Sequence, residues 1–403
     1  MSVPLLDLKP QNLALERELT DAFVRVLRSG HYILGPELER FESEMARFLG
    51  VRHALGVSSG TDAILLALMS LDIGPGDEVI APSFTFFATG GCVSRTGATP
   101  VFADVCPICF NLDLADVARR ITPRTKAILP VHLFGQAADM DPLMALAAKH
   151  GLKVIEDGAQ ALGARYRGRA VGGIGAFGTF SFFPSKNLGA LGDAGLLVTQ
   201  DDALAEKAAL LRLHGAKPKY YHHLVGANFR MDALQAAFLS VKTARYADYT
   251  QARCRNAADY TAQLSCLPGV RVADPAHCGC AVTPDASRAS SEAALILPVA
   301  YPHNEHIWNQ YTVRVPGDGR RDALRAHLQS KGIGTEIYYP VPLHAQPCFA
   351  REVSAQGSPN GKFPFPVSER LAQEVLSLPI YPELSEGQRA EVVAGIREFL
   401  ERS

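Results

Sequence analysis

One lysine stands where it could do covalent chemistry. Residues 177–183 form a short apolar run, and the turn at 184–187 (PSKN) would present Lys186 above the end of the resulting strand. A lysine is costly to bury, so one that directly follows a buried strand needs either a route to solvent or a chemical role. An exposed loop lysine is the ordinary alternative. A partly desolvated amine at this place would form a Schiff base with an aldehyde cofactor.

The residues around Lys186 favour the chemical role. Ser181 precedes it by five residues and offers a hydroxyl group. Glycines at 189, 192 and 195 are expected to let the backbone pass close to a ligand.

A second candidate is the segment SSGTD at 58–62, between a predicted strand at 53–57 and a helix. Its backbone N–H groups, the Thr61 hydroxyl and the positive end of the helix would cradle an anion. A simple helix cap by Ser59 or Thr61 explains the same pattern equally well.

Two further strand ends carry candidate residues. Phe86 follows strand 78–82 and is either a core residue or a stacking plate for a flat ring. Asp157 ends strand 152–157, and a buried carboxylate there needs a partner, which is either a protonated ring nitrogen or an arginine. Gln160 follows closely enough to reach the same ligand.

One planar cofactor would use all four strand ends. Ligands of open α/β sheets gather beyond the carboxyl ends of the strands. Pyridoxal phosphate needs a lysine for its aldehyde, an acid for its ring nitrogen, a flat neighbour for its ring and a cradle for its phosphate. The four strand ends together therefore predict a pyridoxal phosphate site.

The elements that must position these residues alternate along the chain. Apolar runs predict seven strands, at 53–57, 78–82, 99–104, 126–134, 152–157, 177–183 and 195–199. Helical spacing predicts helices at 11–29, 36–49, 63–71, 86–96, 113–120 and 141–150. Strands that alternate with helices and are apolar throughout indicate an α/β fold with a mostly parallel sheet covered on both faces.

The C-terminal part is predicted to be a smaller α+β domain. A helical segment from Met231 to Leu264 connects to it, and it contains strands at 309–315 and 334–339 around a helix. We predict a large domain at 1–245 and a small domain at 246–403. The stretch 274–294, rich in Pro, Ala, Ser and Cys, is expected to be a surface excursion.

Composition excludes several classes of protein. The 403 residues carry 40 basic and 41 acidic side chains with no basic stripe, which argues against nucleic acid as a partner. The apolar runs are too short to span a membrane, and the N-terminus lacks a signal-peptide core. We expect a cytoplasmic protein.

Eight cysteines raise the question of a metal site. Cys106 and Cys109 have the two-residue spacing of zinc ligands, whereas Cys278 and Cys280 have only one residue between them. Without a secretion signal, we expect thiols rather than disulfides, and no metal.

Several longer segments resemble signature blocks of the DegT/StrS family of pyridoxal phosphate-dependent, fold-type I sugar aminotransferases. The resemblance runs from about Leu5 to the segment near 376–388 and is carried by GPGDEVIAPSFTFFAT, ITPRTKAILPVHLFGQAADMD, VIEDGAQALGA, SFFPSKNLGALGD and GANFRMDALQAA. Family dehydratases carry a histidine at the lysine position, so Lys186 disfavours that branch.

The resemblance implies roles for individual residues. Lys186 matches the lysine that carries the cofactor and moves the substrate proton, and Asp157 matches the partner of the ring nitrogen. The remaining matches are Gln160 near the ring hydroxyl, Phe86 at the stacking position, and Gly60, Thr61, Asp62 and Ser181 around the phosphate. Asn228 matches an asparagine that reaches the cofactor of the neighbouring subunit, which implies a homodimer with shared active sites.

The implied activity is transfer of an amino group from L-glutamate to a ketone of a nucleotide-linked sugar, for a surface polysaccharide or a secondary metabolite. The segments LLDLKPQN, YYHHLVGANFRMD and YYPVPLHAQP look most like members that act on 3-keto sugars, including 3-keto hexuronates. A 4-keto-6-deoxy nucleotide sugar is the close alternative, and a keto-cyclitol is a more distant one. A catalytically idle, cofactor-binding regulator on the same fold is an alternative of another class.

Candidate substrate residues are Arg230, Tyr311 and His344. Arg230 could meet a substrate carboxylate or phosphate, and the ordinary alternative is an arginine that packs at a dimer interface. The chain departs from the family pattern at Cys106-Pro-Ile-Cys109, where an Asp-Pro-x-Thr turn is usual, and in the length of 274–294.

Overall fold

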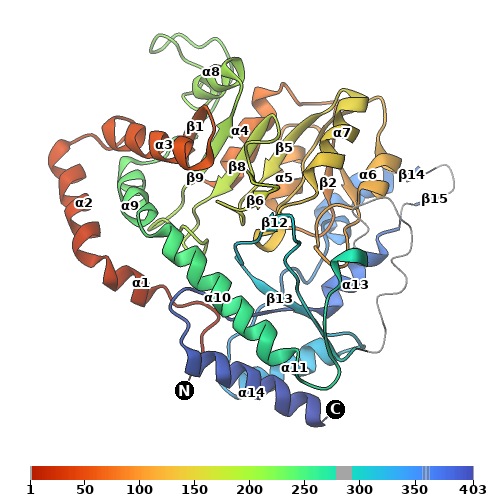
Figure 1. The fold of residues 1–403 in the computed structure, drawn as a ribbon. Helices are drawn as coiled ribbons and strands as arrows, with labels where there is room; N and C mark the ends of the chain where they lie inside the picture. The colour runs from red at the N-terminus through yellow and green to blue at the C-terminus, as the bar shows by residue number, and fades with distance from the viewer. Residues whose placement is uncertain (1, 278–292, 356, 359–360, 363, 403) are drawn as a thin grey trace.

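A seven-stranded sheet forms the centre of the larger part of the molecule. We describe the protein from a computed structural model for residues 2–277, 293–355, 357–358, 361–362 and 364–402 (Figure 1). The strand order is β1-β9-β8-β5-β4-β2-β3. The strands are β1 (His53–Val57), β2 (Glu78–Pro82), β3 (Thr99–Ala103), β4 (Thr125–Ile128), β5 (Lys153–Asp157), β8 (Phe177–Ser181) and β9 (Gly195–Thr199).

The predicted seven-stranded, mostly parallel α/β sheet is confirmed. Strands β3, β2, β4, β5 and β8 pair in parallel. Strand β9 is the exception, because it runs antiparallel to both β8 and β1. The connection from β8 to β9 contains no crossover helix, and only antiparallel neighbours can be joined in this way.

Helices cover both faces of this sheet, which explains why the strands are apolar throughout. Alternate residues of one strand enter different cores, as Val154 and Ile155 do in β5. The first core is covered chiefly by α3 (Pro36–Leu49), α6 (Leu114–Arg120), α7 (Met140–His150) and α9 (Ala233–Thr243). The second is covered by α4 (Gly60–Ser70), α5 (Ala88–Arg95) and α8 (Asp202–Leu211).

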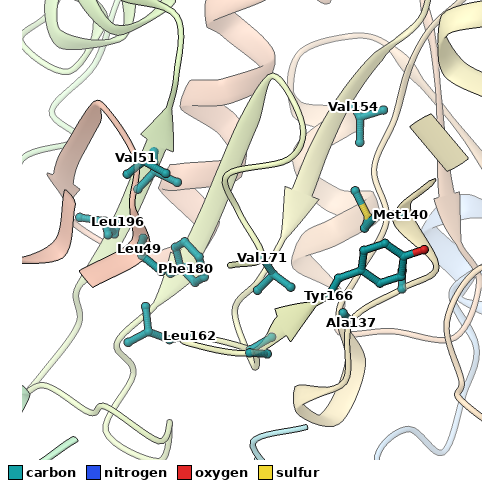
Figure 2. Close-up of a cluster of buried hydrophobic side chains, with 14 of the residues drawn as sticks. Leu49, Val51, Ala137, Met140, Val154, Leu162, Tyr166, Val171, Phe180 and Leu196 are labelled. Carbon is teal, nitrogen blue, oxygen red and sulfur yellow. The ribbon is translucent and has the colours of Figure 1, made fainter. Parts of the chain in front are cut away.

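Figure 2 shows part of the first core. Phe180 and Leu196, from neighbouring strands, lie in the same cluster as Leu49 and Val51, and Tyr166 lies beside Met140. At the N-terminus, α2 (Glu16–Ser29) follows α1 (Lys9–Ala14) and packs on α9 through Leu19 and Val26.

A second, four-stranded sheet lies in the C-terminal part. Its order is β10 (Val270–Val272), β11 (Leu295–Leu297), β13 (Tyr311–Arg314) and β16 (Val375–Leu378). It packs with α11 (Arg320–Ser330), α13 (Pro366–Glu374) and α14 (Glu386–Arg402) in one core. The long helix α10 (Tyr246–Leu264) runs from α9 towards α14, as Figure 1 shows.

The two parts share contacts on either side of the predicted boundary at residue 245, which stays a prediction. Val3 pairs with Ile333, so the N-terminus lies against the C-terminal part. In the other direction, β12 (Asn304–Glu305) pairs with the hairpin β6 (Arg165–Tyr166) and β7 (Arg169–Ala170). Shorter elements complete the described chain: α12 (Ala350–Ala355), β14 (Gly357–Ser358) and β15 (Gly361–Lys362).

Four element predictions need correction. The helix predicted at 11–29 is two helices, α1 and α2, with Leu15 between them. Strand 126–134 is shorter than predicted, because β4 ends at Ile128 and Pro130 has no N–H group to continue a ladder. The helix from Met231 to Leu264 is two helices, α9 and α10, with Ala244 and Arg245 between them. Segment 334–339 forms only a bridge between Glu336 and Ser377.

Most of the predicted excursion at 274–294 lies outside the described residues. In the described part of the chain, no helix has the length and apolarity needed to cross a membrane.

Candidate active site

A cavity of about 600 Å³ opens at the carboxyl ends of the central strands. Its wall includes the start of α4, the end of β5, the end of β8 and the turn that follows β8. A later part of the chain closes it through Gln310, Tyr338 and Tyr339. Ligand pockets of this size and position are usual in α/β sheets.

Lys186 lies in this wall, on the turn after β8, as predicted. The turn is tight, since Lys186 N donates to the Phe183 carbonyl at 2.8 Å. Burial lowers the pKa of Lys186 to about 8, and the negative charge of Asp157 partly opposes this shift. The amine is therefore partly neutral near neutral pH, which suits it to attack a carbonyl carbon.

Asp157 lies in the same wall at the end of β5, and only 4% of it is exposed. Its carboxylate accepts hydrogen bonds from Thr89 Oγ1 at 2.9 Å and from the Ala159 N–H at 3.1 Å. Burial raises the pKa of Asp157, while these two hydrogen bonds and the charge of Lys186 favour the ionised form. The carboxylate is thus held in a fixed orientation and faces a cation.

Thr89 was not predicted from the sequence. It lies on α5, far from Asp157 in the chain, and a threonine within a helix gives no signal of such a contact.

The predicted anion cradle opens into the cavity at the start of α4. Ser59 caps this helix, because its hydroxyl accepts a hydrogen bond from Asp62 N at 3.0 Å. Gly60 and Thr61 line the wall opposite Ser181, and a Cβ at Gly60 would lie 2.7 Å from the Ser181 Cβ. Glycine is therefore required for this close approach. The helix cap by Ser59 is confirmed, and the binding of an anion by this segment stays a prediction.

Two smaller predictions about this region need correction. Asp62 is not part of the cavity wall, and its carboxylate instead accepts a hydrogen bond from Ser58 Oγ at 2.6 Å. The glycines at 189, 192 and 195 approach protein atoms rather than the cavity. Their Cβ positions would meet Pro184, Gln235 and Ser59, respectively.

Phe86 and Gln160 also line the cavity, as predicted. Phe86 is 58% exposed, so its ring is available as a plate for a flat ligand. The Gln160 amide is fixed at both ends: Oε1 accepts from Phe134 N at 2.7 Å, and Nε2 donates to the Tyr339 hydroxyl at 3.0 Å. One Nε2 hydrogen remains for a ligand.

Gln310, Tyr338 and Tyr339 are wall residues that the sequence analysis missed. They lie more than a hundred residues after Thr199, where the last strand predicted for the central sheet ends. The order of strands in the sheet gives no information about which later segments return to it.

Two of the predicted substrate residues lie elsewhere. Tyr311, one residue from Gln310, is fully buried in the C-terminal core, where its hydroxyl bonds with Thr261 Oγ1 at 2.8 Å. Gln310, the wall residue beside it in the chain, directly precedes β13 and lies outside that strand. His344 stacks on Phe365 and bonds through Nδ1 with Ser83 Oγ at 2.5 Å, outside the cavity wall.

Asn228 and Arg230 are also absent from the wall that this chain forms. Asn228 is exposed, and Arg230 is half-buried and pairs through its backbone with Val57. Neither position tests the predicted role of Asn228 toward a neighbouring subunit or of Arg230 toward a substrate, and both stay predictions.

Cys106 and Cys109 are buried in a small cluster with Ile108 and Tyr301, and Cys278 and Cys280 lie outside the described residues. Within the described ranges, His, Cys, Asp and Glu form no group of three that could hold a metal. The expectation of no metal stays a prediction.

Comparisons with known proteins find relatives that match nearly the whole chain. A relative from Streptomyces venezuelae, named dTDP-3-amino-3,4,6-trideoxy-alpha-D-glucose transaminase, is 45% identical over 99% of this chain and 97% of its own. A Geobacillus stearothermophilus relative named "Pleiotropic regulatory protein" is also 45% identical, over 99% of both chains. The crystal structure of S. venezuelae DesV in complex with a ketimine intermediate superposes with a TM-score of 0.88, at 44% identity, and covers 100% of this chain and 99% of that one.

The predicted enzyme class also agrees with the family comparison. The family described as DegT/DnrJ/EryC1/StrS aminotransferase matches residues 14–397, nearly the whole chain. The cavity, its lysine and its buried carboxylate thus lie in a chain that belongs to the DegT/DnrJ/EryC1/StrS aminotransferase family.

Proposed function

We propose that this protein uses pyridoxal phosphate to transfer an amino group from L-glutamate to the C3 ketone of a nucleotide-linked sugar, as a step of amino-sugar biosynthesis. The observation that carries the proposal is the meeting, in one cavity, of an amine whose pKa is about 8 and a buried, oriented carboxylate. When bound, the cofactor supplies an aldehyde that exchanges amino groups and a ring that accepts electrons.

The residues of the cavity fit this cofactor. The N-terminal end of α4 at Gly60 and Thr61, together with Ser181, would hold the phosphate, since free N–H groups and the helix dipole favour an anion. Phe86 would stack on the ring, and Gln160 would donate its remaining N–H to the ring hydroxyl. Lys186 would carry the aldehyde carbon.

In the reaction, the chain's own groups hold and move protons. Asp157 would hold a proton on the ring nitrogen, and Thr89 and Ala159 keep its carboxylate in one orientation. Lys186, once released, would take the proton from the substrate carbon and return it, because an amine with a pKa near the working pH serves as both base and acid.

Names of relatives favour the 3-keto substrate. The S. venezuelae relative is named for a 3-amino sugar, and four further relatives carry names that place the amine or the ketone at position 3. One of these is named for a 3-oxo-glucuronate. We keep the hexuronate as one candidate, with Arg230 as the residue that would meet its carboxylate.

A regulatory role is the second candidate, because the Geobacillus relative is named a regulatory protein. A protein that only binds the cofactor has no need of a proton-transfer lysine. The presence of Lys186 and Asp157 therefore favours the enzyme.

We also propose a homodimer with shared sites. Large apolar side chains are exposed on α2 (Phe23 and Leu27) and in the segment before Asn228 (Tyr220, Tyr221 and Val225), which suits burial against a second copy. If Asn228 serves the neighbouring site, mixing Lys186→Ala with Asn228→Ala subunits will form hybrids with one intact site. About a quarter of wild-type activity is then expected from two inactive parents. No recovery, with exchange of subunits verified, would contradict sharing.

The main experiment follows the half-reactions by absorbance. The amine form, prepared with L-glutamate, is offered 3-keto and 4-keto nucleotide sugars generated in situ. In the reverse direction, the aldehyde form is offered 3-amino and 4-amino nucleotide sugars, which avoids unstable ketones.

Interconversion with position-3 compounds alone supports the proposal, and the panel identifies the nucleotide. Interconversion with position-4 compounds alone would retain the mechanism and replace the substrate. If the absorbance spectrum changes with neither glutamate, other amino donors nor any of the sugars, the regulatory role is favoured over the aminotransferase activity.

A further inference from the structure

The turn that carries Lys186 is a closed loop. Ala190 N donates to the Phe182 carbonyl at 2.8 Å, which joins the two ends of the loop. Inside it, a Cβ at Gly189 would lie 2.3 Å from the Pro184 carbonyl oxygen, so the chain is tightly folded. A loop of this kind moves as one piece, and whatever fixes its position also fixes the Lys186 amine.

Helix α9 contacts this loop through two polar side chains. Lys242 Nζ donates to the Gly189 carbonyl at 3.0 Å, and Gln235 Oε1 accepts from the Leu191 N–H at 3.0 Å. The two residues are seven apart, so they lie on the same face of the helix, two turns from each other. One face of α9 thus holds the loop at two points.

Lys242 is an unusual residue for such a contact, because it is only 2% exposed. Burial lowers its pKa to about 8, and the charge of Glu383 partly opposes this shift. A buried lysine is costly, and an apolar side chain would pack at this position without that cost. The hydrogen bond to the Gly189 carbonyl is the interaction that a lysine adds.

The opposite side of the loop is held by the C-terminal part of the chain. Asn187 Nδ2 donates to the Ile307 carbonyl at 2.9 Å, and Asn309 Nδ2 donates to Asn187 Oδ1 at 2.8 Å. Side chains on both sides therefore hold the loop, and three of its own residues, Phe183, Ser185 and Lys186, line the cavity.

We propose that Lys242, with Gln235, is a positioning residue that fixes the Lys186 turn and so sets the reach and proton affinity of the Lys186 amine. The inference rests on the proposed function, since it assigns α9 a part in the chemistry of Lys186. A group that is misplaced by only 1 Å can lose about 100-fold in rate.

The test uses two substitutions that remove a contact and two controls. Lys242→Met keeps the apolar stem and removes the donor. Gln235→Leu removes the acceptor, whereas Gln235→Glu retains an acceptor oxygen. Phe238→Leu, on the same helix but packed toward α2, controls for general loosening of α9.

The first readout is covalent capture of the cofactor. Borohydride reduction and peptide mass mapping of the wild-type protein show whether Lys186 holds it. The rate of capture by cofactor-free protein is then compared among variants. We expect Lys242→Met to slow capture by about tenfold, Gln235→Leu to slow it less, and Gln235→Glu to match wild type.

The second readout is the pH midpoint of the holoenzyme's absorbance change. A shift of about half a pH unit or more is expected in Lys242→Met, with kcat reduced and KM for the sugar within about twofold of wild type. Midpoints and capture rates no different from those of Phe238→Leu would overturn the inference. If Lys242→Met does not fold, the Gln235 pair decides between the same outcomes.

The experiment distinguishes failure of the proposed function from failure of the positioning role of Lys242 and Gln235. Wild-type protein that is not labelled at Lys186 would refute the proposed function, and the inference with it. Labelling at Lys186 with unchanged variants would refute the inference alone.

Discussion

The cavity has two walls that come from different parts of the chain. One is made of strand ends and includes Lys186, Asp157 and the N-terminal end of α4. The other is made of Gln310, Tyr338 and Tyr339, which carry neutral polar tips. The first wall is held by the hydrogen-bonded sheet, and the second by packing of the C-terminal part.

This difference suggests a division of labour. Charged groups on a rigid sheet suit a cofactor that must be held in one place through every turnover. Neutral hydroxyl and amide groups suit discrimination among sugar hydroxyls. Substitutions in the first wall should therefore abolish chemistry, and substitutions in the second should change substrate preference.

The largest effect is expected for Lys186→Ala. Without the amine, neither carbonyl capture nor proton transfer has a group to perform it, and kcat should fall by at least about 10⁴-fold. Single-turnover absorbance measures this directly. Substantial remaining turnover would remove Lys186 from the mechanism.

A smaller loss is expected for Asp157→Asn. The amide keeps the size of the side chain and loses the charge, so kcat should fall by roughly 10²–10³-fold while the cofactor still binds, more weakly. Equilibrium binding and steady-state rates separate the two effects. A normal rate would favour a structural role for Asp157.

The pKa of Lys186 predicts how capture depends on pH. Below a pKa of about 8 the amine is mostly protonated and cannot attack, so cofactor-free protein should capture the aldehyde about 50-fold more slowly at pH 6 than at pH 8. Above pH 8 the rate should level off. Stopped-flow absorbance gives the profile, and a rise that continues past pH 10 would contradict the shift.

The second wall is tested by Tyr338→Phe. It removes one hydroxyl group of that wall, and we expect roughly a three- to tenfold loss of kcat/KM for the sugar with the glutamate half-reaction little changed. Tyr339→Phe is the matched comparison, since it also releases Gln160 Nε2 and should therefore slow both half-reactions. Equal losses in both half-reactions of Tyr338→Phe would contradict the division of labour.

The smallest effect on activity is expected for Tyr311→Phe. Its hydroxyl serves Thr261 in the core, so the free energy of unfolding should fall by about 1 kcal/mol. The kcat/KM value should stay within about twofold of wild type. A large loss of kcat/KM without loss of stability would support the original prediction that Tyr311 contacts the sugar.

The sequence by itself determined the central sheet and the wall built from its strand ends. Apolar runs such as 53–57 and 78–82 coincide with β1 and β2, because burial on both faces leaves a continuous apolar signal. Asp157 ends β5 and Lys186 follows β8. Because these two strands are parallel, their carboxyl ends lie at the same edge of the sheet, and so do these two residues.

Tertiary structure alone decided the rest. The reversed direction of β9, the return of Gln310 and Tyr339 to the cavity, and the contacts of Thr89 and Lys242 depend on residues far apart in the chain. Tyr311 was predicted one residue away from the wall residue Gln310, because the packing of β13 in the C-terminal core buries Tyr311. The local sequence pattern indicates whether a residue is buried. Which residue it contacts depends on how distant segments of the chain pack together.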